Sequence, residues 1–127
     1  TTCFFIFGLI GATKESILKS IEFALNLNPS HADFKVLTPF PGTKMYDIAK
    51  KNKWIISERY EHLGGYSSTI KINDSLNPDY LEQISSDAFK KFYLRKKYVL
   101  RELKRGNTGT KGYIILKSLF GALKKII

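Results

Sequence analysis

The sequence has little of several residue types, and each shortage excludes a class of protein. Its 127 residues contain one cysteine, Cys3, so this chain alone builds no disulfide scaffold, zinc knuckle or iron–sulfur cluster. Apolar runs are short, because Lys117 interrupts the longest candidate near the end of the chain. A run of about 18 apolar residues is the signature of a membrane-spanning helix, and we expect none.

Acidic residues are also scarce, with 11 Asp and Glu against 21 Lys and Arg. The excess is uneven: residues 1–46 carry a net charge of +1, residues 47–80 are neutral, and residues 81–127 carry +9. A basic third of this kind is compatible with nucleic acid, an anionic membrane surface, an acidic partner domain, or a solvated helix face without a partner. The content of 43% hydrophobic and 25% charged residues is that of a globular domain and excludes disordered and fibrous classes.

The first half of the chain follows the pattern of a parallel α/β unit. Residues 4–7 are apolar without alternation, which is typical of a strand covered on both faces. A helix capped by Thr13 follows and closes at Pro29, and residues 31–37 alternate as a second strand. Thr43 can cap a short further helix. Because the sequence begins directly on a buried strand, without a methionine or a signal peptide, we expect earlier strands of the same protein to lie beside it.

The second half predicts helices. Residues 68–72 are compatible with a short strand after a turn at Gly64-Gly65. Asn77 and Pro78 begin a helix whose apolar stripe continues to residue 103. After the glycines of residues 106–109, a basic amphipathic helix is predicted over residues 111–126.

Two loops are candidates for a binding site. The segment from Gly8 to Thr13 ends the first strand with glycines before a helix, which lets a ligand approach the backbone; the alternative is a tight turn. The segment from Thr38 to Thr43 ends the second strand, where α/β proteins bind ligands. Its prolines fix the loop, and Phe40 offers a stacking face; the alternative is a rigid turn with a core aromatic.

Other reactive or aromatic side chains are better explained by structure. His31 and His62 are isolated from further metal ligands, and Cys3 lies on an apolar strand. Aromatic residues interleave with cations in the basic third, which suits nucleic acid, but helical spacing favours a core position. These residues are Phe89, Phe92, Tyr93 and Tyr98.

Taken in order, these segments resemble the C-terminal part of a radical S-adenosylmethionine (SAM) enzyme. Gly8-Leu9-Ile10-Gly11-Ala12-Thr13 resembles the end of the family's fifth strand, usually Gly-Leu-Pro-Gly-Glu-Thr, and the segment from Ala32 to Thr43 resembles the sixth strand and its loop. Phe92-Tyr93-Leu94-Arg95 and Tyr98-Val99-Leu100-Arg101 are similar to the cobalamin-binding subgroup, of the anaerobic magnesium-protoporphyrin ester cyclase and hopanoid-tailoring type.

The resemblance implies an α/β fold that is the C-terminal fragment of a partial (β/α)6 TIM-like barrel. Residues 1–72 would be the distal part of the barrel, and residues 73–127 a basic helical extension. It also implies SAM, a [4Fe–4S] cluster and, through a missing N-terminal domain, cobalamin. The cluster cleaves SAM to a radical that abstracts a substrate hydrogen. Its Cys-x3-Cys-x2-Cys ligands are absent from this sequence, so we expect the chain alone to be inactive.

Carried over residue by residue, the SAM contacts are Gly8, Gly11 and Thr13 in the first loop and Thr38, Pro39 and Phe40 in the second. No catalytic or metal-binding residue is expected in this chain. Three residues depart from the family pattern. Ile10 replaces a proline, Ala12 an acid, and Cys3 a common glycine.

The expected partners are the missing N-terminal part of the same protein and a small-molecule or lipid-like substrate. The basic tail is expected to contact a membrane surface, and the location to be cytoplasmic or peripheral to the membrane. Nucleic acid is not an expected partner of such an enzyme. The alternative function is a small basic α/β binding module for nucleic acid or an anionic membrane surface.

Overall fold

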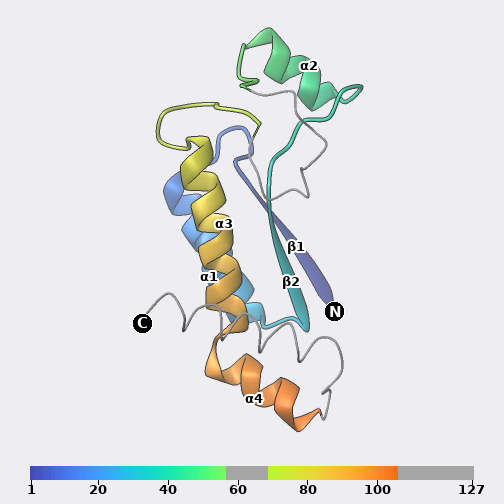
Figure 1. The fold of residues 1–127 in the computed structure, drawn as a ribbon, viewed down its shortest axis with the longest axis vertical. Coiled ribbons are helices and arrows are strands. Elements are labelled where there is room, and N and C mark those ends of the chain that lie inside the picture. The colour runs from blue at the N-terminus through green and yellow to red at the C-terminus, as the bar shows by residue number, and fades with distance from the viewer. Residues whose placement is uncertain (57–68, 106–127) are drawn as a thin grey trace. The chain divides into compact units, whose positions relative to one another are not determined.

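The computed structural model describes residues 1–56 and 69–105, and the chain divides into two compact units, Thr1–Phe89 and Lys90–Ile127. The elements in chain order are β1 (Thr2–Phe7), α1 (Lys14–Leu27), β2 (His31–Val36), α2 (Lys44–Lys51), α3 (Pro78–Tyr93) and α4 (Lys96–Lys104) (Figure 1). The first four elements confirm the predicted order of strand, helix, strand and helix. No helix among the described residues has the length and apolarity to cross a membrane.

The two strands form a parallel pair. Their register runs from Thr2 opposite His31 to Phe7 opposite Val36, and the Leu37 amide donates to the Phe7 carbonyl at 2.8 Å just past the strand ends. Parallel neighbours need a crossover between them, which α1 supplies. Both strands therefore run toward the same edge of the sheet.

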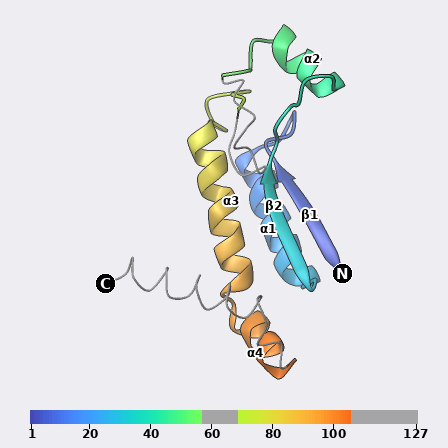
Figure 2. The ribbon, with the colours of Figure 1, turned by 45° about the vertical axis from the view of Figure 1, so that its right-hand side comes forward.

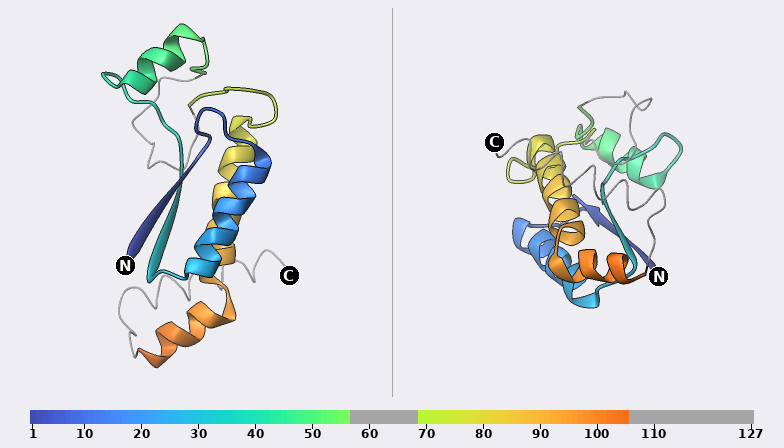
Figure 3. Two further views of the ribbon diagram at one scale, coloured as in Figure 1. Left: turned by 180° about the vertical axis from the view of Figure 1, so that it is seen from behind. Right: turned by 60° about the horizontal axis from the view of Figure 1, so that its bottom comes forward.

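One face of this sheet carries the core of the first unit. Figures 2 and 3 show α1 and α3 lying against the same side of the strands. On that side Phe34 stacks on Phe5 with ring centroids 5.3 Å apart and lies 5.9 Å from Phe7. The Ser85 hydroxyl on α3 donates to the Phe34 carbonyl at 2.8 Å, so a buried hydrogen bond joins the helix to the strand. The buried face of α1 consists of Ile17, Ile21 and Ala24.

On the opposite face of the sheet, the side chains of β1 are exposed and those of β2 are half-buried. Phe4 is 68% exposed and Ile6 is 50% exposed, while on β2 the Lys35 ammonium lies 3.3 Å from the Asp33 carboxylate. The prediction that residues 4–7 are covered on both faces is therefore wrong in this structure. The apolar run reflects a strand with only one buried side.

The predicted partial (β/α)6 barrel is also wrong. The described residues form a small α/β structure with two parallel strands and four helices, and no barrel wall is present among them. Closing a barrel needs many tilted, staggered strands, whereas the described residues form a sheet of two strands. The sequence pattern of each βα unit is the same in a barrel and in an isolated pair, which explains the error.

Between α2 and α3 the described residues make one short pairing instead of a strand. Ile55 and Ile70 form an isolated antiparallel bridge, supported by the Ile56 amide donating to Thr69 at 2.9 Å and the Lys71 amide donating to Trp54 at 2.8 Å. The predicted strand over residues 68–72 is thus reduced to this bridge. The predicted turn at Gly64-Gly65 and the predicted helix over residues 111–126 lie outside the described residues.

The start of α3 is as predicted, but the helical stripe does not continue to residue 103. The Asn77 side chain accepts from the Tyr80 amide at 2.8 Å, and Pro78 is the first helical residue. The helix ends at Tyr93, and α4 begins at Lys96. The bend lets Tyr93 pack edge-on against both Phe92 and Tyr98, with centroids 4.9 Å apart in each pair. Side-chain packing of this cluster outweighs the helical periodicity.

Candidate functional site

The two loops singled out by the sequence leave the same edge of the sheet. Residues 8–13 follow β1 and residues 37–43 follow β2, and the strands are parallel neighbours (Figure 1). The carboxyl edge of a parallel sheet is where α/β proteins bind ligands. The structure thus brings the six predicted contact residues together in two neighbouring loops: Gly8, Gly11, Thr13, Thr38, Pro39 and Phe40.

Each loop contains a glycine turn of the same design. The Ala12 amide donates to the Leu9 carbonyl at 2.9 Å and the Thr43 amide to the Phe40 carbonyl at 3.2 Å. Gly11 has φ of 79° and Gly42 has φ of 87°, as the third residue of a type II turn requires. A Cβ added to either glycine would meet no atom within 4 Å. Both turns therefore leave their backbone open to a ligand.

Gly42 was not among the predicted contacts. The dipeptide Pro41-Gly42 is a type II turn signature on its own. That signal could have identified it from the sequence.

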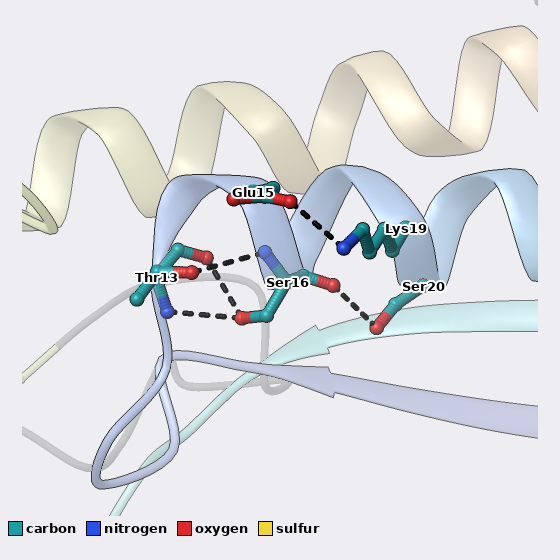
Figure 4. Close-up of polar contacts among 5 residues, drawn as sticks. All are labelled: Thr13, Glu15, Ser16, Lys19 and Ser20. Carbon is teal, nitrogen blue, oxygen red and sulfur yellow. Dashed lines mark hydrogen bonds and ion pairs between the residues drawn. The ribbon is translucent and has the colours of Figure 1, made fainter.

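Both turns lead directly into a threonine that caps a helix. Figure 4 shows the Thr13 hydroxyl accepting from the Ser16 amide at 3.1 Å, while the Ser16 hydroxyl accepts from the Thr13 amide at 2.9 Å. Thr43 accepts from the Tyr46 amide at 3.2 Å and donates to the Phe40 carbonyl at 2.7 Å. The polar groups of Thr13 are used to begin α1, which makes its contribution to the edge one of positioning.

Gly8 faces the protein interior. Its φ is 83°, and an added Cβ would lie 2.9 Å from Cδ1 of Leu81 on α3. A side chain at this position would press on α3 instead of entering open space. Close packing and backbone conformation therefore explain this glycine.

The second loop contains both a buried residue, which fixes its path, and an exposed aromatic residue. The Pro39 side chain is fully buried, and the Thr38 hydroxyl donates to the Val36 carbonyl at 3.3 Å. Phe40 is 47% exposed, and Leu9 and Ile10 of the first loop are also exposed. The edge therefore combines open backbone with exposed apolar side chains.

The described residues offer no metal centre. They contain no group of three or more His, Cys, Asp or Glu side chains that would hold an ion. Cys3 is a half-buried free thiol on β1. A [4Fe–4S] cluster needs several thiolates, so the residues present do not fit one.

Comparison with known proteins gives a distant relative. The chain is 25% identical over 120 residues to a protein of Pyrococcus horikoshii named "Uncharacterized methyltransferase PH0819", and the alignment covers 94% of this chain and 25% of the relative. The chain thus spans about a quarter of the relative's length. No family model matches, and no solved structure matches. The comparison supports the resemblance as far as a likeness to a methyltransferase.

Proposed function

We propose that this chain supplies part of the SAM-binding wall of a radical SAM enzyme. The observation that carries the proposal is the pair of neighbouring exit loops, each with a glycine turn open to a ligand, at the carboxyl edge of a parallel sheet. The likeness to a protein named as a methyltransferase supports SAM as the ligand, because SAM is the common biological methyl donor.

The chemistry of the edge suits a nucleoside. The exposed ring of Phe40 offers a stacking face for adenine, since offset stacking of aromatic rings is favourable. The turns at Gly11 and Gly42 let the ligand approach backbone groups without meeting a Cβ. Backbone contacts, more than side-chain groups, would fix the ribose and methionyl parts.

The other residues of the edge hold these groups in place. Thr13 and Thr43 fix the helix starts through their capping bonds, and the buried Pro39 ring fixes the path of the second loop. A rigid edge reduces the ordering cost of binding. In this proposal the chain's residues bind and orient SAM and carry out no proton or electron transfer.

The cofactor chemistry of the whole protein lies beyond this chain. Its single cysteine does not fit a [4Fe–4S] cluster, and the proposal gives the chain no cluster ligand and no cobalamin contact. The thiolates would come from further sequence of a longer protein, comparable to the relative of which this chain covers a quarter. We propose a small-molecule or lipid-like substrate functionalised at a C–H bond.

The proposal can be tested by nuclear magnetic resonance on the 127-residue chain. SAM is titrated into the ¹⁵N-labelled protein, and amide shifts are followed. We expect weak, saturable shifts confined to the loops at residues 8–13 and 37–43. In Phe40→Ala we expect the affinity to fall by about fivefold, because the stacking face is worth about 1 kcal/mol.

Phe23→Ala is the matched control, because Phe23 is an exposed phenylalanine on α1 outside both loops. Its affinity should equal that of the unmodified chain. Shifts centred on other residues, or equal losses in the two variants, would contradict the proposed site.

A further inference from the structure

The described part of the second unit is strongly basic. Residues 90–105 contain eight Lys and Arg and a single acid, Glu102. The Glu102 side chain is only 12% exposed, and its carboxylate lies 3.6 Å from Arg101 and 3.7 Å from Arg105. The one negative charge of this segment is therefore already surrounded by cations.

The helix α4 has lysines on one side and a buried aromatic residue on the other. Helical spacing places Lys96, Lys97, Leu100 and Lys104 on one side, and all four are exposed, Leu100 at 57%. We call these four residues the outward face of α4. It presents three ammonium groups around one exposed leucine.

The opposite side of α4 is used for packing. Tyr98 is 2% exposed, and the Arg101 guanidinium lies over its ring at 4.9 Å from the centroid. The Arg95 guanidinium lies 4.0 Å from the centroid of Phe92. Two arginines therefore pack on aromatic rings on this side, and lysines are left on the outward face.

Two of the three lysines are not placed for helix stability, whereas Lys104 lies in the last turn of α4, where the helix dipole favours a cation. Lys96 and Lys97 occupy the first turn of α4, which contains no acid. Cations at a helix N-terminus oppose the helix dipole and so destabilise the helix. Sequences that disobey a local stability rule often do so for function.

We propose that the outward face of α4 binds the surface of an anionic lipid bilayer. The three lysines would contact lipid phosphates and carboxylates, and Leu100 would enter the boundary between headgroups and acyl chains. The complementarity of charge and the leucine among the lysines together select this partner.

Single-stranded nucleic acid fits the same surface less well. Its binding sites combine cations with aromatic rings on which bases stack. Here Phe92 is 0% exposed and Tyr98 is buried, so neither ring is accessible to a base. An exposed leucine also has no role against a phosphate backbone.

The test is sedimentation of the full chain with vesicles. Vesicles of phosphatidylcholine alone are compared with vesicles containing about 30% phosphatidylserine. We expect partition onto the anionic vesicles to be at least about tenfold stronger, and to fall in about 0.5 M NaCl because salt screens charges.

Two variants locate the binding on α4. Lys96→Gln/Lys97→Gln/Lys104→Gln should weaken partition by about a hundredfold, at about fivefold per lysine. Leu100→Ala should weaken it about tenfold, because the substitution removes three carbon groups, each of which contributes about fourfold when fully buried, and the headgroup boundary buries them only in part. The matched control is Lys50→Gln/Lys51→Gln/Lys53→Gln, which removes the same charge from exposed positions on and after α2 and should change partition less than twofold.

Equal partition onto neutral and anionic vesicles overturns the proposal, as does an equal loss in the two triple variants. Tighter binding to single-stranded polyuridylate than to anionic vesicles at the same phosphate concentration would identify nucleic acid as the partner and also overturn it. Circular dichroism verifies the fold of each variant. The salt dependence of the unmodified chain tests the electrostatic part without any substitution.

Discussion

The glycine at position 8 can be explained by ligand contact or by close packing, and only its surroundings in the structure distinguish the two. In the sequence it is the first glycine of a loop that resembles a SAM contact. In the structure its open side points at Leu81, 2.9 Å from an added Cβ, and its φ is 83°. Gly11 and Gly42 share the positive φ but face open space. The glycines therefore have different roles, packing for Gly8 and an open backbone for the other two.

This difference predicts unequal costs of the same substitution. Gly8→Ala should lower the free energy of unfolding by about 2–4 kcal/mol, the sum of backbone strain and overpacking. Gly42→Ala should cost only the strain, about 1–2 kcal/mol. Urea unfolding followed by circular dichroism measures both. In a double-mutant cycle with Leu81→Ala, the clash predicts that the costs are not additive; additive costs would show that Leu81 is not the obstacle.

At the scale of elements, the bend between α3 and α4 depends on the aromatic cluster of Phe92, Tyr93 and Tyr98. The ring centroids of Phe92 and Tyr98 lie 5.7 Å apart, although the two residues belong to different helices. In a single straight helix Phe92 and Tyr98 would point to different sides, and their rings would not be in contact. Burial raises the pKa of the Tyr98 phenol above 10.0, and Glu102 and Tyr93 raise it further, while Arg101 and Arg105 oppose the shift.

The raised pKa of Tyr98 predicts a loss of stability in alkali. The fold favours the neutral phenol, so its contribution to the free energy of unfolding is complete below pH 10.0 and is lost as the pH rises through the raised pKa. Tyr98→Phe keeps the ring and removes the ionisation. The difference in unfolding free energy between the two proteins should therefore change in favour of the variant above pH 10.0. A difference that is independent of pH would contradict the shift.

At the scale of the whole molecule, the main feature of the described residues is a two-stranded sheet with helices against one face (Figure 2). Two strands are marginal by themselves and gain stability from packing against helices, here α1 and α3. The same strand β1 therefore carries phenylalanines in opposite environments. Phe7 is 1% exposed, and Phe4 is 68% exposed.

This asymmetry predicts very different effects for two identical substitutions on β1. Phe7→Ala should cost about 3–5 kcal/mol of unfolding free energy, as for a large side chain removed from a core. Phe4→Ala should cost less than about 1 kcal/mol, because most of its ring is already in water. Chemical denaturation of the two variants measures both values. Similar large costs would mean that both faces of β1 are covered in solution.

Local signals predicted the elements of the first unit well. Thr13, Thr43, Asn77 and Pro78 mark helix starts through their own side chains or ring, and these signals depend on neighbours within a few residues. The two exit loops were placed at one edge because parallel pairing follows from the strand–helix–strand order. Gly42 was missed as a contact although the Pro41-Gly42 dipeptide signals its turn. The bend after Tyr93 and the interior orientation of Gly8 were missed because they depend on packing against Tyr98 and Leu81.

The sequence by itself determined where the first three helices and the first two strands begin, that these strands run in parallel, and that the positive charge lies in the last third of the chain. These properties follow from short-range hydrogen bonding, periodicity and composition. Only the tertiary structure decided that the sheet has two described strands with helices against one face, that Gly8 packs on Leu81, and that α4 turns its lysines outward. Such properties depend on which surfaces meet in space, and a periodic pattern of apolar residues is the same whether one face or two are covered.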